Sequence, residues 1–184
     1  MRKFFIFLVF FIFLFSETVA SSQFTDLIYQ KSENIDSALR FINVPEEKIE
    51  ILRTLVKGKL ADTALVNFSN KIVEARETRN VELFKNYVNQ ESVNFSPDML
   101  NRMIDKISDG SLIYGNNGYK YFVTSEPISD RVLNKFYSNN INKPSIALIF
   151  YHYHPSNGAL IGSPTYLIKT ESNFQIVLPV KSVK

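Results

Sequence analysis

The sequence predicts an α+β protein in which helices from the first half of the chain pack on an antiparallel sheet from the second half. Two observations support this class. Apolar residues recur at spacings of three and four as far as Asp109, which is the period of an amphipathic helix. From Ser111 onward they recur at a spacing of two, which is the period of a strand. Helices first and antiparallel strands afterwards are typical of an α+β domain, not of alternating parallel units.

The amino-terminal segment has the features of a cleaved signal peptide. Arg2 and Lys3 precede an unbroken apolar run over residues 4–15, and small residues then lead to Ala20. The run is shorter than the stretch of about 20 residues that a helix needs to cross a bilayer, so we expect no permanent membrane anchor. We expect cleavage after Ala20, with the next two serines as alternatives. The sequence therefore predicts a signal peptide over residues 1–20 and an exported protein, either periplasmic or secreted.

Composition narrows the cellular setting and the partners. The chain of 184 residues contains no cysteine, so disulfides do not stabilise it after export. Its formal net charge is only +3, and the two signs are interspersed. Because nucleic-acid binding needs a concentrated basic face, we expect no nucleic-acid partner. The abundance of asparagine, lysine, isoleucine and phenylalanine is typical of an AT-rich genome and favours a bacterial origin.

After the signal peptide we expect an N-terminal helical extension over residues 21–58, followed by the main α+β domain over residues 59–184. The first helix of the extension is expected within residues 24–42. A second begins at Pro45, which needs no backbone donor in a first turn, and ends at Gly58. The residues expected on the buried face of this second helix are Ile49, Leu52, Leu55 and Val56.

The main domain begins with the strongest helical pattern in the protein, over residues 61–75. Asn80 is expected to cap a shorter helix. Ser96 and Pro97 open another helix, which ends near Asp109. Each of these helices has one polar face, so we expect each to lie on a sheet with its other side in water.

The second half of the chain is predicted to consist of strands and tight turns. Asn117 and Gly118 readily supply the positive φ angles of a hairpin turn. The expected elements are a hairpin of residues 112–114 and 119–124, a short helix over 130–136, a buried strand over 145–153, and a closing hairpin of 165–170 and 174–180.

The only two histidines of the chain, His152 and His154, stand one residue apart at the end of an apolar run. Side chains alternate along a strand, so both imidazoles project from the same side, with their Cα atoms about 7 Å apart. A catalytic zinc site needs three protein ligands and a water held by a base, and the sequence identifies neither the third ligand nor the base. We therefore expect no cofactor, and a zinc ion held by these two histidines is the alternative.

Residues 149–155 resemble the strand ending in His-x-His-Pro of the JAB/MPN (JAMM) family of zinc hydrolases. The resemblance implies a third ligand from a following Ser-x-x-Asp motif and a glutamate base on an earlier strand. Here Ser163 is followed three residues later by Tyr166, and Asp109 is the nearest stand-in for the glutamate. A divergent metal-dependent hydrolase that uses the two histidines is thus the alternative function.

Other catalytic signatures are absent from the sequence. It has no cysteine nucleophile, no Gly-x-Ser-x-Gly elbow, no phosphate-binding glycine loop and no His-Glu-x-x-His helix. Glu74 and Glu77 lie together on a predicted helix, but Arg76 and Arg79 accompany them. We interpret these four residues as a solvated charged face.

From Ala61 onward, the order of elements resembles the NTF2-like (SnoaL-like) α+β cone. Residues 67–83 are similar to the first two helices of that fold, and residues 166–177 are similar to its closing hairpin. The resemblance implies helices packed on a curved antiparallel sheet around a pocket. Aromatic residues are concentrated in the β half, and tyrosine suits contact with a protein or an apolar ligand. The residues expected to line the pocket are Tyr121, Phe150, His152 and Tyr166.

These observations predict an exported bacterial protein of the cell envelope that acts by binding and not by catalysis. No acid–base pair in the sequence can be assigned to the expected pocket. The expected partner is an unknown protein or a small apolar ligand, and an accessory or immunity-type role fits such a protein.

Overall fold

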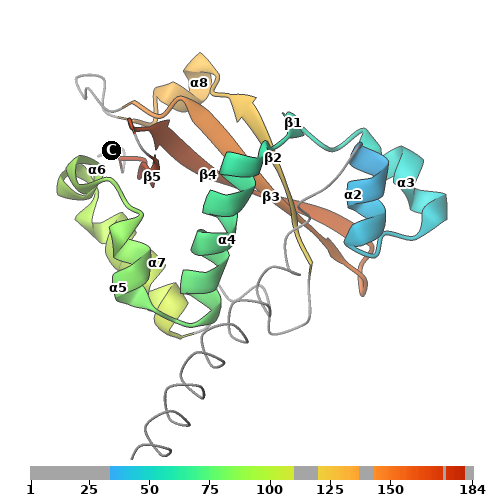
Figure 1. Cartoon of the computed structure of the whole chain (residues 1–184), viewed down its shortest axis with the longest axis horizontal. Helices are drawn as coiled ribbons and strands as arrows, with labels where there is room; N and C mark the ends of the chain where they lie inside the picture. Colours follow the sequence, from blue (N-terminus) through green and yellow to red (C-terminus); the bar gives the residue numbers. More distant parts are fainter. Residues whose placement is uncertain (1–33, 110–119, 137–142, 172, 181–184) are drawn as a thin grey trace, which may run out of the picture.

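The structure is a computed structural model that describes residues 34–109, 120–136, 143–171 and 173–180. Within these residues, five antiparallel strands form one sheet in the order β1-β2-β3-β4-β5, and α4 lies across one face of it (Figure 1). The strands are β1 (Lys59–Leu60), β2 (Phe122–Pro127), β3 (Ile146–His154), β4 (Ala159–Lys169) and β5 (Phe174–Ile176). The helices are α2 (Ile35–Phe41), α3 (Glu46–Arg53), α4 (Thr63–Glu77), α5 (Val81–Asn86), α6 (Gln90–Phe95), α7 (Pro97–Ser108) and α8 (Asp130–Leu133). The α+β class predicted from the sequence is confirmed.

The register of the central strand explains the two-residue period of the sequence. Phe150 of β3 lies opposite Val123 of β2 and Ser163 of β4, whereas Ile149 lies opposite Thr124 and Pro164. Opposed residues of an antiparallel pair point to the same face, and successive residues alternate between faces. We call the side of Phe150 the α4 face, and the side of Ile149 the α2 face.

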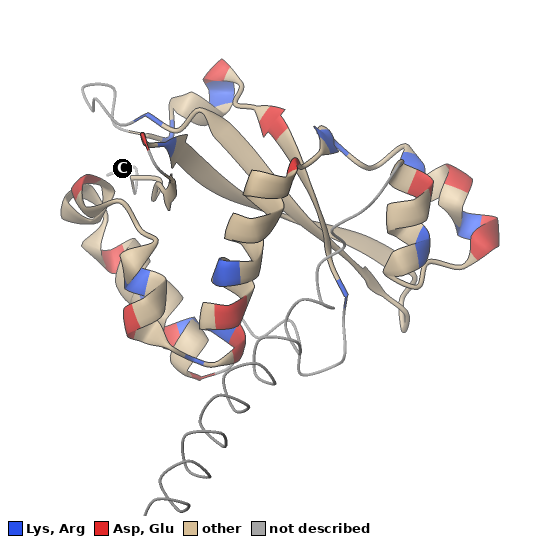
Figure 2. Cartoon of the chain, in the orientation of Figure 1, with Lys and Arg blue, Asp and Glu red and all other residues tan. Residues whose placement is uncertain are grey.

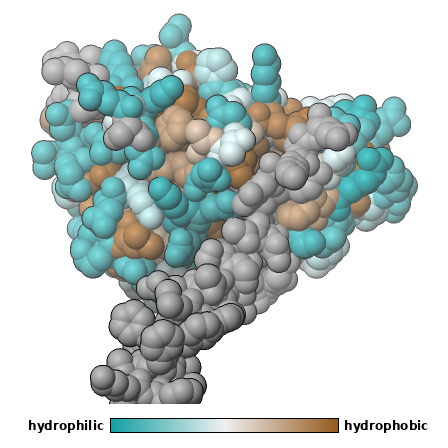
Figure 3. Space-filling model, viewed as in Figure 1, coloured by the Kyte–Doolittle hydropathy of each residue, from teal (hydrophilic) through white to brown (hydrophobic). Residues whose placement is uncertain are grey.

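Each face of the sheet carries its own hydrophobic core. On the α4 face, Phe150, Leu148 and Leu167 pack with the buried side of α4 and with residues of α5 and α7. On the α2 face, Phe122, Ile149 and Tyr151 pack with buried residues of α2 and α3. In the view of Figure 3, hydrophobic atoms lie towards the middle of the described surface and hydrophilic atoms around its edge. This packing on both faces explains why every residue of β3 from Ala147 to Tyr153 is buried, whichever face its side chain is on.

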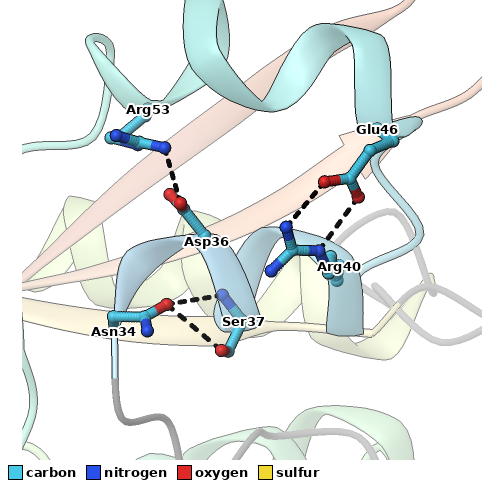
Figure 4. A network of polar contacts seen from close by, with 6 residues as sticks. All are labelled: Asn34, Asp36, Ser37, Arg40, Glu46 and Arg53. Atoms are coloured by element: carbon cyan, nitrogen blue, oxygen red, sulfur yellow. Dashed lines mark hydrogen bonds and ion pairs between the residues drawn. The ribbon is translucent and has the colours of Figure 1, made fainter.

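The helices α2 and α3 form a pair at the end of the sheet where β3 turns into β4 (Figure 1). Two exposed ion pairs join them, Arg40 with Glu46 at 2.6 Å and Arg53 with Asp36 at 2.5 Å (Figure 4). The first turn of α2 is capped by Asn34, whose side-chain oxygen accepts a hydrogen bond from the backbone N–H of Ser37. Leu39 of α2 is fully buried against the sheet.

The end of α3 corrects one prediction. Ile49 and Leu52 are buried as expected, but Leu55 is 54% exposed. The α-helix ends at Arg53, and the Thr54 hydroxyl then donates to the carbonyl of Ile51 at 2.6 Å. Because the helix stops before Leu55, the spacing that would have turned this side chain inward no longer applies.

The later helices begin where the sequence predicted. The Asn80 side chain accepts a hydrogen bond from the N–H of Leu83 at 2.9 Å and begins α5, as expected. Ser96 and Pro97 begin α7. An additional helix, α6, was not predicted, and it begins at Asn89, whose side chain accepts from the N–H of Ser92. The amphipathic spacing of α6 covers too few residues to be recognised in the sequence.

The segment before α6 also closes one edge of the sheet. The N–H of Ile176 in β5 donates to the carbonyl of Tyr87, and the N–H of Asn89 donates to the carbonyl of Ile176. The Asn89 amide adds a bond to the side chain of Gln175. The outer hydrogen-bonding groups of Ile176, on the edge strand, are therefore satisfied within the chain.

The strands differ from the prediction mainly at their ends. β4 begins at Ala159 and not at residue 165, because the turn after His154 is tight enough for β3 and β4 to pair from Ala159 onward. β1 was not predicted, and it follows Gly58, whose φ angle of +76° suits glycine. The turn and first strand of the hairpin predicted around Gly118 lie outside the described residues, as does the predicted signal peptide over residues 1–20.

Among the helices that the structure describes, none combines the length and the apolar character required to span a bilayer.

Candidate functional site

A groove of about 500 Å³ lies on the α2 face of the sheet. Its floor is formed by Ala147 and Ile149 of β3 together with Gly162 and Pro164 of β4. One wall comes from Leu55 and Lys57, in the segment that follows α3. The other wall comes from the segment that joins β2 to α8 and from Val132 of α8. The groove is thus the part of this face that lies between the α2–α3 pair and α8.

The floor requires a residue without a side chain at one position. Gly162 lies opposite Tyr151, and a Cβ atom at Gly162 would stand 2.8 Å from Cε1 of that ring and 3.3 Å from Cγ2 of Ile149. The Tyr151 ring is itself stacked on Phe122, with centroids 5.1 Å apart and planes 16° apart. The small residue therefore leaves room for the tyrosine ring and keeps the groove open above it.

Polar groups gather at the rim of the groove around the Tyr151 hydroxyl. The backbone N–H of Lys57 donates to this hydroxyl at 2.8 Å, and the Thr124 hydroxyl donates to the carbonyl of Lys57 at 2.7 Å. These two bonds hold the backbone of Lys57 against the sheet while its side chain stays exposed and lines the groove. Glu126 lines the groove from β2 and is half-buried.

The ionisation of Tyr151 reflects this setting. Burial raises the pKa of Tyr151, the hydrogen bond from Lys57 opposes that shift, and the nearby Glu126 carboxylate adds to it. The hydroxyl is therefore neutral at physiological pH and can act as a hydrogen-bond partner, not as an anion.

Tyr166, one of the predicted pocket residues, lines the groove at its α8 end. It lies opposite Ala147, and its ring meets that of Phe136 edge to face, with centroids 5.1 Å apart. Phe136 is buried just after α8, so this contact anchors the end of the groove.

The other three predicted residues, Tyr121, Phe150 and His152, lie on the α4 face and are nearly fully buried. The rings of Tyr121 and His152 meet at a centroid distance of 5.7 Å. The guanidinium of Arg76 in α4 lies 5.8 Å from the centroid of the Phe150 ring. The structure thus places these three residues on one face of the sheet, with Arg76 against Phe150, and the sheet separates them from Tyr166.

Burial of Arg76 corrects the interpretation of the charged residues on α4. Arg76 is only 5% exposed, and its guanidinium also lies 5.9 Å from the Phe84 ring. Its position follows Leu65, Ser69 and Ile72 at helical spacing, and these residues are all buried. This spacing continues the buried face, so the position of Arg76 in the sequence predicts that it points inward. The prediction was missed because a charged side chain is ordinarily expected in solvent.

The two histidines occupy the same face of β3, as their spacing predicted. Burial, and to a smaller extent the neighbouring His154, lowers the pKa of His152 below its ordinary value, so this imidazole is neutral at pH 7. Nδ1 of His154 lies 2.9 Å from the Ser156 hydroxyl. Within the described parts of the chain, no group of three metal-ligating side chains is found. A zinc site at these histidines therefore stays a prediction without a third ligand.

The sequence did not identify most of the residues that form the groove. Leu55 was interpreted as a core residue, Tyr151 was placed only within the buried strand over 145–153, and Gly162 and Pro164 fell outside every predicted strand. Pro164 is the cause, because proline interrupts strand patterns although it is tolerated where the ladder does not need its N–H. The alternation of Leu160, Gly162, Pro164 and Tyr166 along β4 is the signal that would have revealed this face.

Charged side chains are distributed mainly over the helices and connecting segments, and the strands carry few of them (Figure 2). Fold and site together define an α+β protein with a groove on its sheet, between the α2–α3 pair and α8. No family model matches the sequence, and comparisons with curated proteins and with solved structures give no significant match.

Proposed function

We propose that this protein is exported from a bacterial cell and acts by binding a partner protein or a small apolar ligand in the groove on the α2 face, without catalysis. One observation carries the proposal. The groove of about 500 Å³ has a floor of Ala147, Ile149, Gly162 and Pro164, and polar groups including the Tyr151 hydroxyl and the side chains of Lys57 and Glu126 line it as well. A concave surface that combines an apolar floor with placed polar groups is the usual form of a binding site.

The arrangement of polar groups supports binding more than catalysis. A hydrolase needs a nucleophile or an activated water and a base within hydrogen-bonding distance of it. In the groove, the Tyr151 hydroxyl is held by the backbone of Lys57, and Glu126 is the carboxylate that lines the groove from β2. A phenol whose pKa is raised is a poor nucleophile, so this cluster suits recognition. An accessory or immunity-type role in the cell envelope is consistent with such a site.

A plugged groove tests the proposal. Pro164 is exposed on the floor, so Pro164→Trp places a large ring in the groove without disturbing the core. Ile161→Trp is the matched control, because Ile161 lies on the same strand, is 37% exposed and points to the α4 face. The three proteins are purified from the native envelope and compared by native mass spectrometry. We expect a bound partner or small molecule with the wild type and the control, and its loss with Pro164→Trp. Equal retention by all three proteins would contradict a role for the groove.

Metal analysis of the same samples distinguishes the alternative, a JAB/MPN-type zinc hydrolase using His152 and His154. We expect no stoichiometric zinc in the wild type and no loss of folding stability after treatment with a chelator. Stoichiometric zinc that disappears in the double variant His152→Ala, His154→Ala would instead support the hydrolase.

A further inference from the structure

We propose that the occupant of the groove is an extended segment of a partner protein that carries an acidic side chain opposite Lys57 and a basic side chain opposite Glu126. This inference rests on the proposed function, because it names the partner of the same groove. It excludes the small apolar ligand that the proposed function allows.

The shape of the groove favours an extended chain. Four alternating residues of β4, from Leu160 to Tyr166, line it. At about 3.3 Å per residue, they extend over about 20 Å. The groove is open to solvent along this length, because Gly162 and Pro164 on its floor are exposed. An extended segment of about six residues has the same length and turns alternate side chains toward the floor.

The charged side chains that line the groove distinguish a peptide from an acyl chain, which would also fit an elongated groove with an apolar floor. Lys57 is exposed and Glu126 is half-buried, and both line the groove. In the described part of the chain, the ion pairs join Arg40 with Glu46, Arg53 with Asp36 and Lys85 with Glu82, so neither groove charge is paired. A hydrocarbon would remove water from both charged groups without replacing the hydrogen bonds that the water makes. A peptide can instead present a group of opposite charge to each.

The surroundings of the groove favour a partner that is larger than the groove itself. Gly162 and Pro164 are exposed along its open side. At its α3 end, Leu55 is 54% exposed and Ile51 is 67% exposed. Ile51 stands in the last turn of α3, four residues before Leu55, so exposed apolar residues continue along the chain from the wall of the groove. A small ligand held on the floor would leave Ile51 in water, whereas a protein segment with flanking residues covers it.

A displayed library of random peptides, selected on the wild-type protein and counter-selected on Pro164→Trp, provides the probe. We expect enriched peptides with an acidic and a basic residue separated by apolar residues. A synthetic peptide of the enriched sequence is then titrated against charge-reversed proteins. Lys57→Glu should weaken binding by at least about tenfold, because it places like charges together. A peptide with its acidic residue replaced by lysine should recover the affinity for Lys57→Glu, and Glu126→Lys should show the mirror-image behaviour.

Lys59→Glu is the matched control for the charge reversals. Lys59 is exposed and lies two residues from Lys57. Its neighbour Leu60 pairs with Thr124 on the α2 face, so Lys59 points to the α4 face, away from the groove. This variant should bind the peptide with unchanged affinity. The inference is overturned if no peptide survives the counter-selection, or if neither charge reversal changes the affinity. If a small molecule is lost with Pro164→Trp while no peptide is enriched, the proposed function stands and this inference is wrong.

Discussion

At the scale of single residues, the groove depends on a contact between a glycine and a tyrosine. The Tyr151 ring is fixed from three directions, by stacking on Phe122, by the hydrogen bond from Lys57, and by the close approach of Gly162. A ring held in this way cannot move aside when its neighbour grows. The residue types at these positions therefore determine the shape of the floor as well as its stability.

Gly162→Ala tests this contact. The added methyl group would lie 2.8 Å from the Tyr151 ring, a distance that forces a shift of the ring or of the strand. Alanine is otherwise favoured over glycine in a strand, so an ordinary site would gain stability. We expect a loss of about 1 kcal/mol in the free energy of unfolding, because overpacking outweighs that gain. Denaturant titration measures the effect, with Pro164→Ala on the same face as the control. A Gly162→Ala variant more stable than the wild type would contradict this prediction, because it would show that the Tyr151 ring moves aside at little cost.

The lowered pKa of His152 predicts a pH dependence of stability. The folded protein holds this imidazole neutral, whereas the unfolded chain binds a proton with the ordinary pKa of about 6.5. The unfolded state therefore binds more protons below that value, and stability falls as the pH falls, with a slope of at most about 1.4 kcal/mol per pH unit. Unfolding titrations between about pH 7.5 and 5 measure this slope.

His152→Gln should remove most of that slope. His154→Gln should keep most of it, because burial is the larger cause of the shift. This pH range lies above the one in which carboxylates titrate. The effect of the histidine on the pH dependence of stability is therefore separated from that of groups such as Glu46. Identical slopes in the wild type and in His152→Gln would rule out this source of pH dependence.

At the scale of secondary-structure elements, the α2–α3 pair is attached to the sheet by apolar contacts and not by its ion pairs. Both ion pairs visible in Figure 4 have side chains that are largely exposed, apart from Asp36. Exposed pairs contribute little, because solvent and salt screen them and because two long side chains lose freedom. Leu39, by contrast, is fully buried between α2 and the sheet.

Two substitutions in α2 separate these contributions. Leu39→Ala should lower the free energy of unfolding by about 2–5 kcal/mol, because it leaves a cavity in the core of the α2 face. Asp36→Asn, which breaks the ion pair with Arg53, should cost about 1 kcal/mol or less, and this cost should shrink further at high salt. Denaturant titrations at low and high salt provide both numbers. If Asp36→Asn lowered the free energy of unfolding more than Leu39→Ala, the ion pairs and not the apolar contacts would be the main attachment of the α2–α3 pair.

The elements that the sequence predicted well are those with strong local signals. α4 shows a long apolar repeat, α5 begins at the Asn80 cap that was expected, and α7 begins at Pro97 as expected. α6 and β1 were missed because they are too short to show a period. Leu55 was misplaced because the end of α3 depends on the hydrogen bond from Thr54, and such a bond is not visible in apolar spacing.

At the scale of the whole molecule, both faces of one sheet are covered, and they are covered unequally. α4, α5 and α7 provide the large core on the α4 face, whereas the α2–α3 pair and α8 leave a gap on the α2 face. The sequence indicated that aromatic residues concentrate in the β half, but it did not show that Tyr166 faces away from Tyr121, Phe150 and His152. That separation depends on the register between β3 and β4, which is set by the turn after His154 and by long-range pairing. The site thus arises from topology, and local patterns alone do not predict it.

The predicted signal peptide concerns the fate of the whole chain, because it predicts export from the cytoplasm, which can be tested directly. In a bacterial host, we expect the protein in the fraction outside the cytoplasm, beginning at Ser21, because Ala20 ends the small-residue segment after the apolar run. Amino-terminal sequencing and intact mass identify the start of the chain. The double variant Leu8→Asp, Phe11→Asp places two charges within the run and should retain the full-length protein in the cytoplasm. Glu17→Gln, a charge change outside the run, is the control and should be exported and processed like the wild type. A full-length wild-type chain that remains in the cytoplasm would refute export, and the partner would then have to be sought inside the cell.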